Sequence, residues 1–160
     1  MKVREVLAGK KGRVVSVRPD KPVTQLPNLF DEHNISSVLV IDARGRLHGI
    51  VTDRLFLTAM AQRGARFSEL TAVDIMQSPV PSCAPGDSVT EAMRRMTQER
   101  VRHLVVLDEG RLAGIVSIGD LVKARLTDFE MESRVLREMA LVHMSAMETG
   151  AGSGPRRSEQ

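Results

Sequence analysis

The residues of this chain best suited to chemistry are Ser117-Ile118-Gly119-Asp120, which stand directly before an apolar segment that reads as a helix. The first turn of a helix carries unpaired backbone N–H groups and the positive end of the helix dipole, so it favours an anion such as phosphate. The Ser117 hydroxyl would add a donor, and Gly119 would permit close approach. Equally, Ser-x-x-Asp is the pattern of a capping box, which stabilises a helix end by about 1 kcal/mol without any ligand.

The elements that must position these residues come in two copies. Segment 35–51 reads ISSVLVIDARGRLHGIV and segment 101–116 reads VRHLVVLDEGRLAGIV, nearly residue for residue once one extra residue near Arg44 is allowed. Upstream, Ser16 aligns with Ser82, 66 positions later (82 − 16). A unit of this size buries little core alone. We therefore predict that the copies pack face to face about a pseudo-twofold axis and form a cleft between them.

Each copy reads as strand, helix, strand, strand, helix, which predicts an α/β (α+β) fold. In the second copy, apolar residues recur at helical spacing after Ser88, a residue suited to an N-cap. Two short apolar strands, 104–107 and 112–116, flank the hairpin turn 108–111. The closing helix is expected to begin after Ser117.

The first copy follows the same plan with proline substitutions. Pro22 and Pro27 replace Ser88 and Met93, and Pro27 is expected to kink or delay the helix because it lacks a backbone donor. A closing helix is predicted over 55–62, ended by Gly64.

A short helical lead-in is predicted before each copy, at 3–7 and 73–76. The predicted organisation has four parts: repeat 1 (1–66), repeat 2 (67–126), a C-terminal helix (127–148) and a disordered tail (149–160). The C-terminal helix is amphipathic, with apolar residues that include Phe129 and Leu136. It could pack on its own domain or contribute to a dimer interface, and the sequence leaves both open.

Composition indicates one soluble domain of 160 residues, with 42% hydrophobic and 27% charged residues. No apolar run approaches the roughly 20 residues of a membrane span, and the first eight residues lack the apolar stretch of a signal peptide. Cys83 is the only cysteine, which suits a reducing compartment and predicts a cytoplasmic location.

Nucleic acid is not an expected partner, although the net charge is +3. Basic residues are spread along the chain in short clusters, Lys10-Lys11-Arg13 among them, with no long basic stripe. Trp and Tyr are absent from the sequence, so a base-stacking platform is missing. Basic residues at one small anionic ligand remain compatible with the pattern.

The paired strand-turn-strand segments, each followed by a Ser/Thr-x-x-Asp-like turn, resemble a tandem cystathionine-β-synthase (CBS) domain pair, the Bateman module. The resemblance covers about residues 1–126 and is most specific over 101–126. It implies a stand-alone bacterial CBS pair whose modules form disc-like homodimers. It also implies clefts that bind adenosyl ligands, with AMP, ADP or ATP ahead of NAD(H) or S-adenosylmethionine, and no metal. The resemblance further implies that the module regulates another protein, which the sequence does not identify, and that it catalyses no reaction.

The resemblance also assigns roles to residues. Asp120 would accept hydrogen bonds from the ribose 2′ and 3′ hydroxyls, because a carboxylate beside phosphate would be repelled. Backbone groups near 80–83 would read the adenine edge. The complete predicted site is Asp120, Ser117, Gly119, Ile118, Ile115, Val80, Ser82, Cys83, Arg102 and His103, with Ile115 packing on adenine and Arg102 and His103 near phosphate.

The first copy departs from this pattern. Leu55 stands where Asp120 stands in the second copy, and Ser36-Ser37 replace Arg102-His103. A leucine cannot accept a hydroxyl proton. We therefore predict one competent nucleotide site per chain, with the first-copy cleft empty, weak or adapted to another group; Asp53 could substitute only if the turn shifted by two residues.

Three function classes follow from the sequence. A ligand-sensing regulatory module fits best, and a ligand-free dimerisation or interaction module is the alternative. An enzyme is the weakest reading, because no His/Cys metal spacing, nucleophile elbow or phosphate-binding Gly-Lys-Ser/Thr loop occurs in the sequence.

Overall fold

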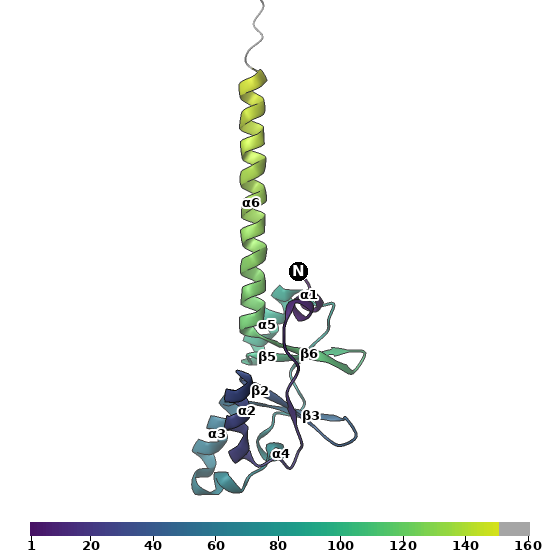
Figure 1. Cartoon of the computed structure of the whole chain (residues 1–160), viewed down its shortest axis with the longest axis vertical. Coiled ribbons are helices and arrows are strands. Elements are labelled where there is room, and N and C mark those ends of the chain that lie inside the picture. The colour runs from purple at the N-terminus through teal and green to yellow at the C-terminus, as the bar shows by residue number, and fades with distance from the viewer. Residues whose placement is uncertain (151–160) are drawn as a thin grey trace, which may run out of the picture.

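The structure is a computed structural model that describes residues 1–150, with side chains described as far as Met147. The predicted disordered tail, 149–160, lies outside the described residues apart from the last two residues of the final helix. Two α/β repeats are stacked, and one long helix rises from the second of them (Figure 1).

Each repeat folds into the predicted order of elements. Repeat 1 contains β1 (Ser16–Val17), the 3₁₀ helix η1 (Val23–Gln25), α2 (Leu26–His33), β2 (Ser37–Ile41), β3 (Leu47–Thr52), α3 (Asp53–Arg63) and the 3₁₀ helix η2 (Gly64–Glu69). Repeat 2 contains β4 (Ser82–Cys83), α5 (Val89–Glu99), β5 (His103–Asp108), β6 (Arg111–Ser117) and α6 (Ile118–Gly150). The predicted α/β fold is confirmed.

The two sheets have the same topology. In each, the short first strand pairs in parallel with the central strand, which pairs antiparallel with the last, giving the orders β1-β2-β3 and β4-β5-β6. The register shifts at matching places, between Val40 and Ile41 and between Val106 and Leu107. The extra residue in the first hairpin therefore lies in its turn and leaves the strand pairing equivalent.

The sheets pack against each other, as predicted. Leu39 and Ile50 of repeat 1 and Val105 and Ile115 of repeat 2 form one buried apolar cluster between them. The opposite face of each sheet forms a separate core with the helices that cover it. Side chains of a strand alternate between faces, so the continuous apolar strands serve both layers at once.

Pro27 delays its helix without kinking it. A turn of 3₁₀ helix precedes α2, and Pro27 then stands in the first turn of α2. Its missing N–H would have no intrahelical partner at that position, so the proline is tolerated there.

The lead-in helices form, but each packs on the opposite repeat. The N–H groups of Val3 and Arg4 in α1 (Val3–Gly9) donate to the turn that follows β4, at 3.0 Å each. In return, Ala72 in α4 (Ala72–Ile75) donates to the carbonyl of Lys21 at 2.8 Å. The chain therefore crosses between repeats before each sheet begins, which the expected simple lead-in to each repeat did not include.

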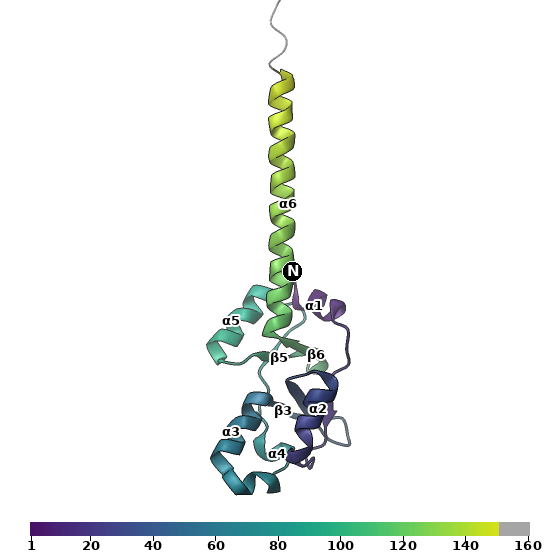
Figure 2. The ribbon, with the colours of Figure 1, turned by 60° about the vertical axis from the view of Figure 1, so that its left-hand side comes forward.

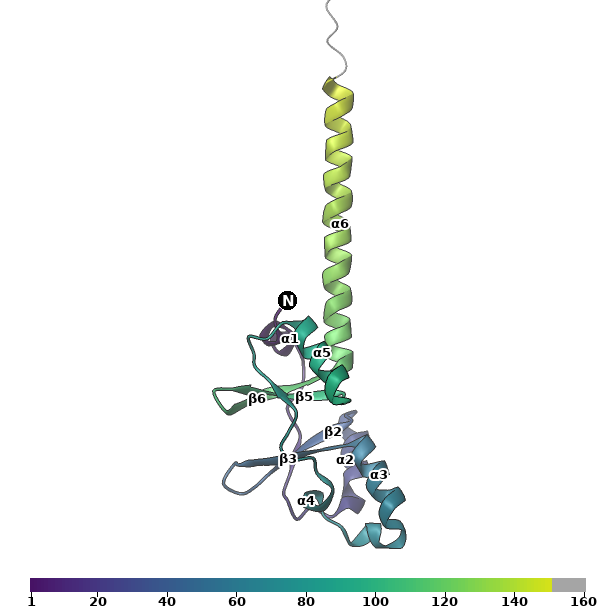
Figure 3. The same cartoon turned by 180° about the vertical axis from the view of Figure 1, so that it is seen from behind.

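The final helix is one uninterrupted element of 33 residues. Its first turns are flanked by α5 and α1, and the rest projects away from both repeats (Figure 2, Figure 3). Of the two interpretations left open for the C-terminal helix, packing on its own domain is therefore wrong.

Candidate functional site

Ser117 and Asp120 form a complete cap at the start of α6. The backbone N–H of Asp120 donates to Ser117 Oγ at 3.2 Å, and the N–H of Ser117 donates to Asp120 Oδ2 at 2.8 Å. This is the reciprocal capping box that the Ser-x-x-Asp pattern allows. The Asp120 side chain nevertheless keeps 26% of its surface exposed, so the cap does not remove it from contact with a ligand.

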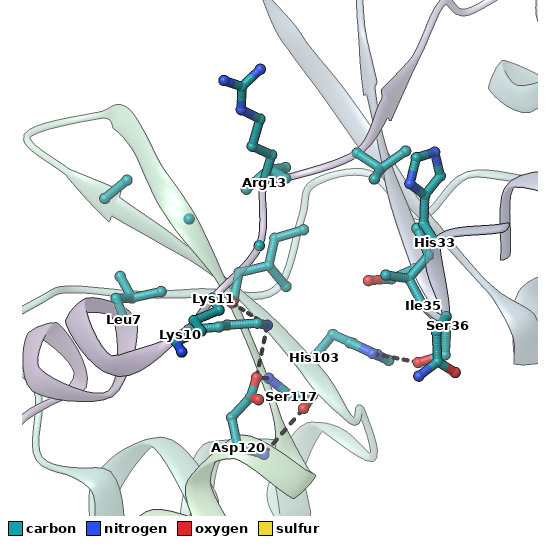
Figure 4. Close-up of a pocket in the computed structure, with 18 residues that line it drawn as sticks. Leu7, Lys10, Lys11, Arg13, His33, Ile35, Ser36, His103, Ser117 and Asp120 are labelled. Carbon is teal, nitrogen blue, oxygen red and sulfur yellow. Dashed lines mark hydrogen bonds and ion pairs between the residues drawn. The ribbon is translucent and has the colours of Figure 1, made fainter. Parts of the chain in front are cut away.

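Asp120 lines a cavity of about 560 Å³ between the repeats. Repeat 1 contributes the loop around 33–37, repeat 2 contributes 113–115 of β6 with Ser117 and Asp120, and the crossing segment 10–15 runs between them (Figure 4). The apolar part of the lining comprises Leu7, Val14, Val15, Ile35, Ala113 and Ile115. Apart from two glycines, the rest of the lining is polar or charged, so the cavity has one apolar part and a larger polar part.

Lys10 ties the crossing segment to this site. Its Nζ donates to Asp120 Oδ2 at 2.9 Å and to the carbonyl oxygen of Ile115 at 3.1 Å. Burial alone would raise the pKa of the Asp120 carboxyl, but the hydrogen bonds from Lys10 and from the N–H of Ser117 outweigh burial and hold that pKa below its ordinary value of 3.8. Asp120 is therefore a carboxylate, an acceptor only, near neutral pH.

Several basic residues line the same cavity as the carboxylate. Lys10, Lys11 and Arg13 come from the crossing segment and His33 from the end of α2 (Figure 4). Three of these side chains carry fixed positive charge, against the single carboxylate of Asp120 in the lining. The cavity therefore favours an anionic ligand.

His103 lies in the cavity wall as a buried, hydrogen-bonded group. Its Nε2 is 3.0 Å from Ser36 Oγ of repeat 1, and the residue is 7% exposed. Burial, the largest influence, lowers the pKa of the imidazole below 6.5. The ring is therefore mainly neutral at pH 7, and it joins the repeats by a hydrogen bond.

The two repeats are each matched by the family model of the CBS domain, over residues 3–62 and 72–127. This chain belongs to the CBS-domain family. The CBS pair is 38% identical to the CBS-domain protein ATU1752 of Agrobacterium tumefaciens, with a TM-score of 0.74 over 78% of this chain and 92% of that one. It is 28% identical to the CBS domain-containing protein YhcV of Bacillus subtilis, over 72% of this chain and 81% of that protein.

A third similar structure is that of the CBS domain protein PAE2072 of Pyrobaculum aerophilum in complex with AMP. It is 24% identical and covers 83% of this chain and 99% of that one, with a TM-score of 0.69. At this identity the likeness establishes a shared fold. Within residues 1–150, no helix of this CBS pair is long and apolar enough to cross a membrane.

Because each lead-in segment crosses to the opposite repeat, only some of the predicted site residues line the same cavity of the CBS pair. Asp120, Ser117, Ile115 and His103 all line one cavity. Ile118 packs toward the core of repeat 2, and Gly119 follows it in the first turn of α6.

Ile118, Gly119 and the other four predicted residues all lie outside this lining. Val80 lines a second cavity near the hairpin turns, Ser82 accepts a hydrogen bond from Arg95 through its carbonyl, and Cys83 is buried in the repeat 2 core. Arg102 forms an ion pair with Asp53 at 3.0 Å. Segment 10–15 occupies the place that the sequence analysis gave to 80–83, because each lead-in serves the opposite repeat.

Sequence reasoning missed the basic residues of the lining. Lys10, Lys11 and Arg13 were recognised only as a short positive cluster, and His33, Asn34 and Ser36 were not singled out for this site. The positive cluster was the one feature of the sequence that indicated an anion site. The sequence does not show that this cluster lies beside Asp120, because the two are about 110 residues apart in the chain.

The corresponding position in repeat 1 is built differently. Thr52 Oγ1 caps α3 by accepting from the N–H of Leu55 at 3.2 Å, which confirms that Thr52 aligns with Ser117 and Leu55 with Asp120. Leu55 returns no hydrogen bond to the cap, since its side chain is a hydrocarbon. Close by, the Arg102–Asp53 ion pair and a hydrogen bond from Arg54 to the carbonyl of Arg100 at 3.2 Å link the repeats directly.

Proposed function

We propose that this CBS pair is a regulatory module that binds one adenosine-containing nucleotide per chain in the cavity at Asp120. The observation that carries the proposal is a carboxylate at a helix N-terminus, placed in a cavity between the repeats whose lining also includes Lys10, Lys11 and Arg13. The complex of the similar Pyrobaculum aerophilum protein with AMP supports this ligand class.

The lining divides into parts that suit the parts of a nucleotide. Asp120 would accept hydrogen bonds from the two ribose hydroxyls, and charge-assisted hydrogen bonds of this kind are the stronger ones. Lys10, Lys11 and Arg13 would hold the phosphate, assisted by the positive end of the α6 dipole. Ile115 and its apolar neighbours would contact the adenine face.

Binding would be regulatory because the cavity joins separate parts of the chain. A ligand there would contact the loop of repeat 1, a strand of repeat 2, the crossing segment and the start of α6 together. A ligand shifts a conformational equilibrium only by its difference in affinity for the two states. Contacts to both repeats at once supply such a difference, which a partner protein could detect.

One site per chain is expected from the repeat 1 counterpart. Leu55 offers no acceptor for ribose hydroxyls, and the Arg102–Asp53 pair uses the nearest carboxylate. We expect AMP, ADP or ATP to bind ahead of S-adenosylmethionine, because the basic lining rewards phosphate charge and S-adenosylmethionine carries no phosphate; NAD(H), which carries two, is the second candidate.

Calorimetric titration of the full chain with AMP, ADP, ATP, NAD⁺, NADH and S-adenosylmethionine tests the proposal. We expect binding near one per chain. Asp120→Asn should weaken it by about 100-fold, since each hydrogen bond to a charged group contributes roughly 1.5–3 kcal/mol. Asp53→Asn is the matched control and should leave affinity unchanged. Two equal sites per chain, or equal effects of both substitutions, would refute the assignment.

The alternative is a ligand-free interaction module, and the exposed length of α6 is the observation that favours it. Failure of all six compounds to bind would support it and would leave Asp120 as a helix cap. We propose no catalytic activity, and incubation with ATP followed by chromatography for hydrolysis products tests that expectation.

A further inference from the structure

The projecting part of α6 carries a large uncovered apolar surface. From Phe129 to Met147, every residue except Ser133 is exposed. The exposed large apolar side chains from position 126 onward are Leu126, Phe129, Met131, Val135, Leu136, Met139, Leu141, Val142, Met144 and Met147. At roughly 100 Å² each they expose on the order of 1,000 Å² in total, distributed around the helix rather than gathered in one patch.

The projecting part of α6 gains no stability from packing on its own repeats. At 33 residues, α6 is about 50 Å long. Most helical stability in proteins comes from packing of an apolar face, and from Phe129 to Met147 this face is exposed. The projecting part of α6 therefore needs a partner surface.

One stripe on α6, apolar except for Ser133 and His143, has the spacing of a coiled coil. Steps of four and three residues alternate without a break along Val122, Leu126, Phe129, Ser133, Leu136, Ala140, His143 and Met147. We call these eight residues the α6 stripe. At its start, Val122 is 40% exposed while the adjacent Leu121 is fully buried in the repeat 2 core. The α6 stripe is thus turned away from its own repeats and is open to another molecule.

The charges beside the α6 stripe complement those of an identical helix. In a parallel pair, the residue just before Leu126 or Ser133 faces the residue five places later in the other helix. Arg125 would face Glu130 of a second copy, and Glu132 would face Arg137. Within one chain, Arg125 and Glu132 lie 3.9 Å apart, on the same flank.

An antiparallel pair would match the charges less well. Glu130 would still face Arg137, but Arg125 and Glu132 would face apolar residues of the other helix. A parallel pair of helices is symmetric, so the Arg125–Glu130 contact and the Glu132–Arg137 contact would each form twice.

We propose that α6 pairs in parallel with α6 of a second copy of this chain, through the α6 stripe. The exposed apolar members of the α6 stripe, Val122, Leu126, Phe129, Leu136 and Met147, offer on the order of 500 Å² per helix, a large part of the roughly 800 Å² per partner that a stable interface buries. Self-complementary charge identifies the partner as another copy. The pairing would place two nucleotide cavities near the base of one shared coiled coil.

Sedimentation equilibrium of the full chain, with two matched substitutions, tests the pairing. Leu136 and Leu141 are each 66% exposed, but only Leu136 belongs to the α6 stripe. Leu136→Glu should raise the dimer dissociation constant at least about 100-fold, because it sets two carboxylates against each other in an apolar contact. Leu141→Glu should change it less than about threefold. A single-chain mass at tens of micromolar, or equal effects of both substitutions, would overturn the proposal.

A cysteine cross-link tests the orientation and separates α6 pairing from contacts between the repeats. In a Cys83→Ala background, His143→Cys would lie beside its own copy in a parallel pair and should form a disulfide-linked dimer on mild oxidation. Leu141→Cys, two residues away and outside the α6 stripe, should not. Absence of the His143→Cys link, or equal linking of both variants, would overturn the parallel arrangement.

Discussion

Lys10 Nζ and Asp120 Oδ2 are 2.9 Å apart, which joins the crossing segment that leaves α1 to the first turn of α6. The same carboxylate oxygen also accepts the N–H of Ser117. Ribose hydroxyls at Asp120 would compete with Lys10 for this acceptor. Ligand binding and the position of the crossing segment should therefore be coupled.

Lys10→Ala should separate the phosphate from the ribose contribution to affinity. We expect AMP to bind about tenfold more weakly, because a phosphate contact is lost, while adenosine binds equally well or better because its competitor for Asp120 is gone. Calorimetry with both ligands measures the two effects. Lys21→Ala, outside the cavity lining, is the control. An equal loss for AMP and adenosine would mean that Lys10 acts only by supporting the structure.

The Asp120 carboxylate should contribute to the free energy of unfolding at neutral pH, and this contribution should be lost in acid. The pKa of its carboxyl is below 3.8 in the folded chain, so its stabilising contribution is complete above the unfolded value and is lost as pH falls through the folded value. The pKa values of Asp42 and Asp74 are also lowered, so wild type must be compared with Asp120→Asn. We expect the difference in unfolding free energy, measured with urea, to shrink below about pH 4. A constant difference from pH 3 to 6 would contradict this origin.

Gly49 and Gly114 occupy equivalent strand positions but should respond differently to alanine. A Cβ at Gly49 would lie 2.6 Å from Met76 Sδ and 2.8 Å from the backbone oxygen of Gln77, whereas one at Gly114 would lie 2.9 Å from the end of the Leu7 side chain. Backbone cannot yield as a side-chain end can. We expect Gly49→Ala to destabilise by about 2–3 kcal/mol and Gly114→Ala by about 1 kcal/mol. Thermal or urea unfolding compares them, and the reverse order would be inconsistent with the crossing at α4.

Cys83 should be chemically inert in the folded chain. It is 4% exposed, and burial raises the pKa of its thiol to about 11. The thiolate is the reactive form, so iodoacetamide at pH 8 should label Cys83 only as the chain unfolds. Labelling rates followed by mass spectrometry across a urea series measure this. Rapid labelling of the folded protein, without urea, would show that the core around β4 opens.

Residues that are close in the chain made much of the fold predictable. The apolar strands on either side of a glycine turn predicted both hairpins, and Ser88 and Thr52 cap the helices that follow them. The internal repeat then predicted two equivalent sheets, because the same pattern of apolar residues along the strands buries the same face of each sheet. The alignment of Leu55 with Asp120 likewise follows from the sequence alone.

Contacts between distant segments were decided by the tertiary structure alone. Local periodicity specifies a helix or a strand and its buried face, but it does not specify which repeat a short lead-in will cover, since either offers a similar apolar surface. The chain crosses, so Lys10 reaches Asp120 while Cys83 becomes part of a core. The amphipathic pattern of α6 likewise predicted a covered face. Only the direction in which α6 leaves repeat 2 showed that this face lies beyond the reach of its own domain.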